Sequence, residues 1–190
     1  MKYARLNYDD KPRDRIIQAA YRLFYRNGFS ETGINEILEL SDSHKASLYR
    51  YFGSKDDLGR FTLNLEKERF LSFLSRALRK YPQYPRFVSF WVKTVRRTMT
   101  GNFKRGCPFV RYSQTAGEGR FSDEIIRQVF SEAEKLLTGY FQRCRGKTEA
   151  EAAPAARKAL AAYEGAVQMV LLSGDESYFG IMEEMLNSVL

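Results

Sequence analysis

The residues best suited to bind another molecule lie in a short polar stretch, residues 44–51, with the sequence HKASLYRY. It combines two cations with several hydroxyl groups inside two helical turns. Lys45 and Arg50 are suited to donate to O6 and N7 of guanine, and the serine and tyrosine hydroxyls suit phosphate oxygens. Leu48 and Phe52 are four residues apart, so they would bury the opposite face of one helix. The pattern predicts a helix that presents a DNA-reading surface.

This helix needs a partner that holds it, and the sequence supplies one directly before it. Ile34, Ile37 and Leu38 have the spacing of an amphipathic helix, and Asp42-Ser43-His44 supplies a polar turn. Two short helices joined by such a turn are the layout of a helix-turn-helix motif, whose second helix enters the major groove. Ser54 is then predicted to be the N-cap of a further helix with an acidic first turn.

Further DNA contacts are expected around the motif. Thr32 precedes the first of the two helices, where backbone N–H groups and the helix dipole attract phosphate, and Asn35 follows one turn later. His44 either contacts DNA or is an exposed turn residue, and Tyr49 either contacts phosphate or packs in the core. Ala46 suits a thymine methyl group. The set predicted from the residues is Thr32, Asn35, His44, Lys45, Ala46, Ser47, Tyr49, Arg50 and Tyr51.

The run SLYRYFGSKDDL, residues 47–58, resembles the signature of TetR/AcrR-family transcriptional regulators. That signature has a small residue, Leu, Tyr, two variable positions, Phe, and a helix that starts with Ser-Lys. Upstream, residues 16–29 resemble the first helix of the family and its exit turn. The resemblance covers residues 13–58 and departs at Asp42-Ser43, where the family usually has Gly and an apolar residue. Asp tolerates the left-handed backbone, so the turn is expected to survive with less packing between the helices.

The resemblance implies further sites and partners. By analogy with the family, Lys55 contacts phosphate, the protein binds a palindromic double-stranded DNA operator as a homodimer, and a small-molecule inducer occupies a pocket. The candidate pocket residues are Phe73, Phe87, Trp91, Phe103, Cys107, Tyr112, Gln114, Tyr163 and Gln168. The candidate dimer interface, on two long apolar stripes, is Ile126, Val129, Phe130, Leu137, Leu160, Val167 and Leu171. The alternative is that these stripes only close the core of one subunit.

Gly106-Cys107-Pro108 has two interpretations. A cysteine that begins a helix near Lys104 and Arg105 has a lowered thiol pKa and can sense oxidants or electrophiles. A small buried hydrophobe is the other interpretation, because cysteine is among the most buried residue types. Cys144 is the weaker candidate for a sensing thiol.

The chain has a net charge of +8, which suits a polyanionic partner. The excess is uneven: residues 1–60 carry +2, residues 61–110 carry +9 and residues 111–190 carry −3. The basic middle block is therefore a solvated surface, a source of long-range attraction to DNA, or a hint of an anionic ligand. Two cysteines form no disulfide framework, and neither a membrane span nor a signal peptide is recognisable, so a cytoplasmic protein is expected.

Almost every segment has a helical pattern, so the predicted fold class is all-α. About nine helices are expected: residues 12–27, the two of the helix-turn-helix, and 55–80, 86–100, 107–116, 122–144, 149–173 and 176–190. The predicted domains are a three-helix DNA-binding head, residues 1–53, and a larger helical ligand-binding and dimerisation body, residues 54–190. The helix at 55–80 is expected to couple the two.

The predicted function is a ligand-responsive transcriptional regulator, most simply a repressor that an inducer releases from DNA. An enzyme is not expected, because one histidine leaves no His-based triad and no Cys/His cluster has metal-ligand spacing. No cofactor or metal is expected either. The alternatives are a redox-sensing regulator that uses Cys107, a helical binding protein whose head no longer reads DNA, and an activator.

Overall fold

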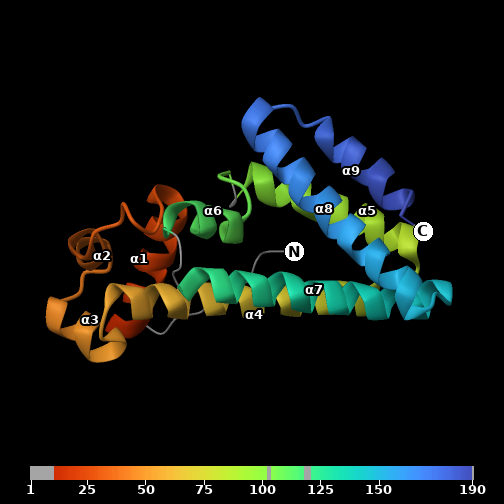
Figure 1. The fold of residues 1–190 in the computed structure, drawn as a ribbon. Helices are drawn as coiled ribbons and strands as arrows, with labels where there is room; N and C mark the ends of the chain where they lie inside the picture. Colours follow the sequence, from red (N-terminus) through yellow and green to blue (C-terminus); the bar gives the residue numbers. More distant parts are fainter. Residues whose placement is uncertain (1–10, 102–103, 118–120, 190) are drawn as a thin grey trace. The chain divides into compact units, whose positions relative to one another are not determined.

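The computed structural model describes residues 11–101, 104–117 and 121–189 of the chain. Within these residues the regular structure is helical throughout, which confirms the predicted all-α fold class (Figure 1). The helices are α1 Pro12–Asn27, α2 Ile34–Leu40, α3 Lys45–Phe52, α4 Lys55–Lys80, α5 Tyr84–Thr100, α6 Pro108–Thr115, α7 Phe121–Arg145, α8 Glu149–Ser173 and α9 Tyr178–Asn187. Over the described part of the chain, no helix has the length and apolar character that a membrane span requires.

The helices form two compact units. The first unit contains the described residues up to Lys67 and those of Pro108–Ile126. The second contains the described residues of Glu68–Cys107 and those from Arg127 onward. Helices α4 and α7 therefore each contribute residues to both units, and α6 belongs with the N-terminal helices.

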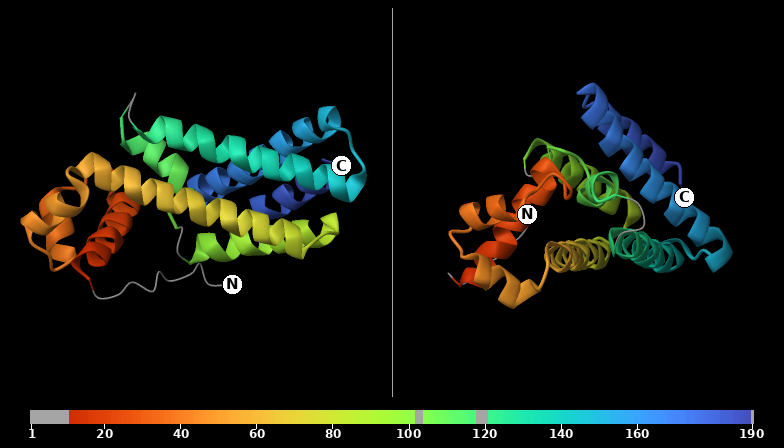
Figure 2. Two further views of the ribbon diagram at one scale, coloured as in Figure 1. Left: turned by 90° about the horizontal axis from the view of Figure 1, so that it is seen from below. Right: turned by 60° about the vertical axis from the view of Figure 1, so that its left-hand side comes forward.

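Helix α1 is the centre of the first unit, and both α2 and α3 pack on it (Figure 2). It begins at Pro12, whose missing N–H costs nothing at the first helical position. It ends at Asn27 and is capped by Gly28, whose φ of 101° excludes most side chains and whose N–H donates to the carbonyl of Phe24 at 3.0 Å. The chain can therefore turn sharply from α1 towards α2.

An aromatic cluster forms the core of the first unit. The ring centroid of Phe29 lies 5.0 Å from that of Phe24, 5.4 Å from that of Phe121 and 6.0 Å from that of Tyr112. Gly59 of α4 makes room for this cluster, because a Cβ there would lie 2.4 Å from the Phe29 ring. Helices from distant parts of the chain are thus joined around one ring.

In the second unit, α8 and α9 lie side by side and α5 also packs on α9 (Figures 1 and 2). Two buried tyrosines tie this unit together through backbone carbonyls. The hydroxyl of Tyr84 donates to Leu186 at 2.5 Å, and that of Tyr140 donates to Tyr81 at 2.8 Å. Burial raises the pKa of Tyr84 and of Tyr140, so both hydroxyls remain protonated donors.

Candidate nucleic-acid interface

The turn between α2 and α3 has the backbone that a helix-turn-helix requires. Asp42 has a φ of 45° and is the one non-glycine residue with positive φ within the described part of the chain. Its N–H donates to the carbonyl of Glu39 at 3.2 Å, and that of Ser43 donates to Leu38 at 3.1 Å. Asp is among the few residues that adopt this conformation at low cost, so the departure at Asp42-Ser43 leaves the turn intact.

Arg15 of α1 holds this turn from outside the motif. Its Nε donates to the carbonyl of Ser41 at 2.9 Å, and its Nη2 donates to that of Asp42 at 3.0 Å. A guanidinium can make two such bonds at once because its donors lie in a fixed plane. Arg15 is not predictable from the sequence, since nothing in the local pattern connects it to carbonyls 26 and 27 residues away.

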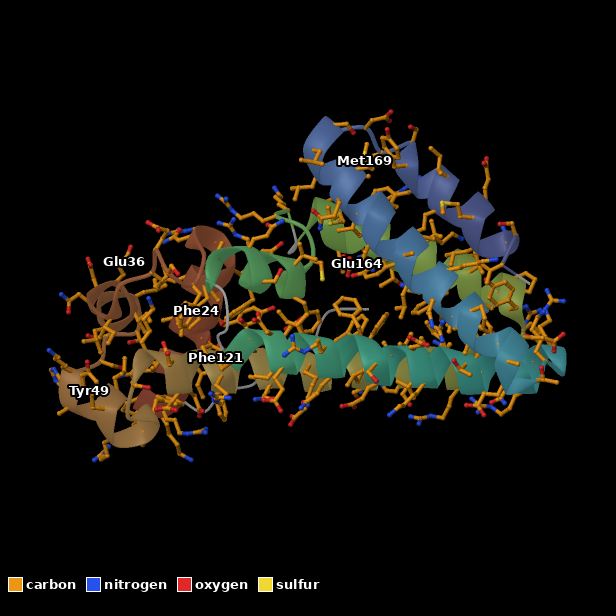
Figure 3. All side chains as sticks on the ribbon, viewed as in Figure 1. Phe24, Glu36, Tyr49, Phe121, Glu164 and Met169 are labelled. Carbon is orange, nitrogen blue, oxygen red and sulfur yellow. The ribbon has the colours of Figure 1, made fainter. Side chains whose placement is uncertain are left out.

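Helix α3 divides into a buried and an exposed face. Leu48 and Phe52 are buried against the rest of the first unit, as their spacing predicts. Tyr49 is 41% exposed, so the alternative that it packs in the core is excluded, and Figure 3 shows it on the outer side of α3. The other candidates on and before this helix are exposed, namely His44, Lys45, Ala46 and Arg50, or half-buried, namely Ser47 and Tyr51.

The two cations of α3 lie against neighbouring tyrosine rings. The Arg50 guanidinium carbon is 4.8 Å from the Tyr51 ring centroid, and its Nη2 donates to the Tyr51 hydroxyl at 2.8 Å. The Lys45 Nζ lies 5.9 Å from the ring centroid of Tyr49. Cation–π contacts of this kind restrict long side chains without neutralising them. Both charges are therefore oriented on the exposed face and remain available to phosphate or guanine.

Thr32 does not have the predicted role. Its side chain is fully buried and its hydroxyl donates to the carbonyl of Gly28 at 2.7 Å. The hydroxyl therefore stabilises the turn between α1 and α2 and faces away from solvent. Asn35, by contrast, is exposed as the second residue of α2. Gly33 is the N-cap of this helix and donates its N–H to the Glu36 carboxylate at 2.7 Å.

Lys55 begins α4 and is half-buried. Its Nζ donates to the carbonyl of Ser30 at 3.2 Å and lies 4.7 Å from the Phe29 ring centroid. The preceding Ser54 accepts from the N–H of Asp57 at 3.0 Å, as expected of an N-cap. Lys55 therefore connects α4 to the loop before α2, and it carries a positive charge at the first turn of α4.

Helix α6 is bonded to the same loop through Thr115. The Phe29 N–H donates to the Thr115 hydroxyl and the Ser30 N–H donates to its carbonyl, both at 3.0 Å. A Cβ at Gly28 would lie 2.8 Å from the Thr115 side chain, so glycine is also required for this close approach. The loop that precedes the helix-turn-helix is thus fixed by a helix that follows it by some 80 residues.

The candidate pocket residues are divided between the two units. In the second unit lie Phe73, Phe87, Trp91, Cys107, Tyr163 and Gln168. The rings of Trp91 and Tyr163 stack with centroids 5.6 Å apart, and that of Phe87 lies 5.2 Å from Trp91. These three candidates form one aromatic group, and their place in a ligand pocket stays a prediction. Phe103 lies outside the described residues.

Tyr112 and Gln114 lie on α6 in the first unit. Tyr112 belongs to the aromatic cluster around Phe29, and its hydroxyl is 2.8 Å from that of Thr62. Burial raises its pKa, so the hydroxyl is a neutral group already engaged inside this unit. Gln114 is exposed. Neither residue has the surroundings that were expected of a polar pocket group.

A hollow of about 180 Å³ opens on the surface of the second unit. It is lined by Met99, Thr100, Lys104, Val170, Leu171, Gly174, Glu176 and Phe179. None of the candidate pocket residues lines it. It is shallow and mixed in character, so it differs from the enclosed, mainly apolar sites that bind drug-sized ligands.

The candidate dimer residues are mostly internal. Val129, Leu137, Leu160 and Val167 are buried within the chain, and Ile126 and Phe130 are half-buried. These stripes therefore close the core of one subunit, which was the alternative interpretation, and Leu171 is the exposed member of the set. An apolar stripe cannot by itself distinguish burial within a chain from burial between chains.

The basic block at residues 61–110 is largely a solvated surface. Most of its lysines and arginines are exposed, including Arg79, Lys80, Lys93, Arg97 and Lys104. This distribution gives no support to an anion site inside the second unit.

Residues 16–59 match the family model of the bacterial regulatory proteins, tetR family. Over 57 residues the chain is 39% identical to the HTH-type transcriptional regulator QacR of Staphylococcus aureus, a match that covers 30% of each protein. It is 41% identical over 64 residues to the regulator LmrA of Bacillus subtilis, which covers 33% of this chain and 34% of LmrA. The matches therefore span about a third of the length of these relatives.

Solved structures are similar over most of the chain. SCO4454, a TetR-family transcriptional regulator from Streptomyces coelicolor, has a TM-score of 0.82 at 20% identity and covers 94% of this chain and 93% of its own. Reduced NemR of E. coli has a TM-score of 0.80 at 18% identity, with coverage of 94% and 98%. At these identities the structural similarity establishes the fold alone. The sequence similarity to the family model lies in residues 16–59.

Proposed function

Because the chain is a helix-turn-helix transcriptional regulator of the TetR family, we propose that it is a ligand-responsive repressor that binds a palindromic operator as a homodimer. The observation that supports this most directly is the exposed face of α3. It carries Lys45, Tyr49 and Arg50, while Leu48 and Phe52 fix the helix from behind. Such a helix fits the major groove with cationic and hydroxyl groups directed at base edges and phosphates.

A homodimer is supported by exposed apolar side chains on two adjacent helices. Met169 and Leu172 of α8 are 37% and 78% exposed, and Ile181 and Met185 of α9 are 45% and 48% exposed. Gly165, four residues before Met169, has open space where a side chain would be, so another helix can approach closely. A self-complementary apolar surface suits a two-fold interface, which would present two heads about 34–36 Å apart to successive major grooves.

The dimer has a direct test. The double substitution Leu172→Glu with Ile181→Glu inserts two charges into the proposed interface, and we expect sedimentation to show monomers and operator affinity to fall. The matched control is Lys93→Glu, an exposed change on α5, which should leave a dimer. A double variant that remains dimeric contradicts the proposed interface.

In the proposed cycle the ligand-free dimer fits both half-sites, and a ligand bound in the second unit favours a conformation that does not. Helices α4 and α7 both contribute residues to both units, and we expect α4, which directly follows the helix-turn-helix, to carry the change. The ligand lowers DNA affinity only by binding the other conformation more tightly, and a tenfold loss requires about 1.4 kcal/mol of difference.

The test of DNA recognition is selection of fragments from the source genome by the purified protein at moderate salt. We expect one palindrome to be enriched, and the variant Lys45→Ala/Tyr49→Ala to lose that enrichment while it remains folded, since both side chains are exposed. Lys93→Ala, which removes an exposed lysine elsewhere, is the charge control. Equal enrichment by the double variant and the control would exclude α3 as the reading helix.

The thiol-sensor alternative is less well supported. Cys107 is 4% exposed, and the Glu164 carboxylate lies beside its sulfur. Oxidants must reach the sulfur of a sensing thiol, and the burial of Cys107 limits this access. A head that no longer reads DNA is also less well supported, because the backbone of its turn is intact at Asp42.

A further inference from the structure

Glu164 of α8 is a buried carboxylate that the chain leaves unsatisfied. Both of its oxygens are shielded from solvent, and neither has a hydrogen-bond partner within the described residues. Leu160 and Val167, four residues before it and three after it, lie on the same helical face and are buried. The side chain projects from the side of α8 that faces away from α9 (Figure 3). An acid therefore lies in the apolar face of a helix.

Glu164 differs from the other buried polar groups without a partner, which are the Arg111 Nε and the Ser122 hydroxyl. Arg111 has other donors, one of which reaches the carbonyl of Arg26 at 3.5 Å, and Ser122 is neutral in every protonation state. Glu164 alone in this group can be an anion with no donor at either oxygen. Buried unsatisfied groups are rare in folded proteins, and each one requires an explanation.

Among the described residues, Cys107 is the one titratable group that acts on the pKa of Glu164. The Cys107 thiol lowers the pKa of Glu164, because it stabilises the ionised carboxylate. An S–H group is a weak donor, however, and cannot replace an N–H or O–H. Burial dominates and raises the pKa of Glu164 to about 7. Lys104 and Arg105, the cations next to Cys107 in the sequence, are exposed. At neutral pH the buried side chain of Glu164 is therefore present both as the protonated acid and as the ionised carboxylate.

The described residues near Glu164 offer no cluster of metal ligands, and they include an aromatic pair. Within the described ranges, no three His, Cys, Asp or Glu side chains are grouped to hold a metal. Tyr163, adjacent to Glu164 in the chain, stacks on Trp91 at 5.6 Å. Gly106 brings the chain close to α8, since a Cβ there would lie 3.1 Å from Leu171 and 3.6 Å from Gln168. Aromatic rings and a carboxylate are the groups that recognise organic cations.

We infer that Glu164 anchors an inducer that carries a protonated amine or amidinium on an aromatic body, with the cation bonded to the carboxylate and the body against the Trp91–Tyr163 pair. The inference rests on the proposed function, because it assigns a ligand class to that regulator. A cationic ligand supplies a charged hydrogen-bond donor, which the described residues do not offer to Glu164. Hydrogen bonds between charged groups are stronger than those between neutral groups. It reaches the carboxylate by displacing Cys107, which precedes the first residue of α6.

The test uses three probes that share one ring system: 1-naphthylmethylamine, 1-naphthylmethanol and 1-naphthoate. Trp91 is the single tryptophan, so its fluorescence reports binding directly. We expect the protonated amine to bind about tenfold or more tightly than the alcohol at pH 8, and the carboxylate to bind weakest. In Glu164→Gln the amine should lose this advantage while the alcohol is unchanged. Glu149→Gln, an exposed acid on the same helix, is the matched control and should retain the preference.

A pH series supplies a second readout. An aliphatic amine stays protonated from pH 6 to 8, whereas Glu164 must lose its proton to pair with it, so the amine should bind about tenfold more weakly at pH 6 than at pH 8. Glu164→Gln should show no such dependence, and its cooperative unfolding serves as the check on folding. Equal binding of amine and alcohol, no binding of the amine, or a preference that survives in Glu164→Gln overturns the inference.

The outcome is separable from that of the proposed function. Operator selection with ligand-free protein tests the regulator without reference to Glu164. If the palindrome is enriched and the amine does not bind, the ligand class is wrong and the repressor stands. If the amine binds through Glu164 and no DNA is enriched, the ligand class stands and the repressor is wrong.

Discussion

Each compact unit of this protein contains a shielded glutamate, and the two have different surroundings. Glu66 of α4, in the first unit, is 2% exposed, and its carboxylate accepts a hydrogen bond from the Tyr21 hydroxyl at 2.9 Å. Glu164 of α8, in the second unit, has both oxygens buried without a hydrogen-bond partner among the described residues. The first unit satisfies its buried acid with its own donor, whereas the second does not.

This difference matches what each unit is expected to do. The first unit must hold α3 in one orientation, so its polar groups are used for internal bonds: Arg15 to the turn, Thr32 to Gly28, Thr62 to Tyr112. A binding unit must keep part of its bonding capacity for a molecule that arrives later. A buried acid that is hydrogen-bonded within the chain makes its unit more rigid. A buried acid without a partner can select a ligand that donates to it, but it lowers the free energy of unfolding of the ligand-free protein.

The largest effect is expected from removal of the satisfied acid. Glu66→Ala leaves a cavity in the first unit and deprives the Tyr21 hydroxyl of its acceptor, so we expect urea unfolding to show a loss of about 3 kcal/mol. The exposed neighbour Glu68→Ala should change the free energy of unfolding by less than about 0.5 kcal/mol. Equal effects of the two substitutions would remove the structural role given to Glu66.

Substitution of the unsatisfied acid should have the opposite sign. The pKa of Glu164, about 7 in the folded protein, lies above its ordinary value of 4.5, so the folded state holds a proton that the unfolded chain releases between these pH values. Stability from this group therefore falls as pH rises from 4.5 to 7. Glu164→Gln should be about 3 kcal/mol more stable than the parent at pH 8 and indistinguishable at pH 4. A pH-independent difference would contradict this assignment.

Arg15 tests whether the internal bonds of the first unit matter for DNA. Arg15→Ala frees the carbonyls of Ser41 and Asp42, so the turn before α3 gains mobility and we expect operator affinity to fall about tenfold. Arg22→Ala removes an equal charge from an exposed position of the same helix. If the two variants bind DNA with the same affinity, the loss is one of charge and the turn is held without Arg15.

The smallest effect is expected at Thr115. Thr115→Val keeps the shape of the side chain but removes the acceptor of the Phe29 N–H, which should cost about 1 kcal/mol of unfolding free energy. Thr115→Ser keeps the hydroxyl and should cost less. The reverse order would mean that the methyl group, and not the hydrogen bond, holds this loop.

Local patterns predicted the elements of the fold well. Proline at the start of α1, glycine after its end, and Ser54 before α4 act within a few residues, so the sequence alone indicated these boundaries. The buried pair Leu48 and Phe52, and the left-handed Asp42, were predicted for the same reason. Each depends on neighbours along the chain and not on the tertiary arrangement.

The roles that depend on distant residues were not predictable. Thr32 is a reasonable phosphate ligand by position, but the sharp turn at Gly28 directs its hydroxyl inward. The Thr115–Phe29 bond joins residues 86 apart, and no periodicity reports such a pair. Glu164 did leave a signal, because it interrupts the apolar spacing of Leu160 and Val167, and an acid at such a position is worth noting in any helix.

Helix α6 is a short helix of the first unit, and it directly follows Cys107 of the second. It has eight residues, so at about 1.5 Å per residue it spans about 12 Å between Cys107, beside Glu164, and Thr115, bonded to the loop before the reading motif. A helix of two turns bends little, so in the proposed cycle we expect α6, together with α4, to pass a displacement of Cys107 on to this loop. A flexible joint in its middle, such as Ser113→Gly at an exposed position, should leave operator binding and inducer binding intact but disconnect one from the other.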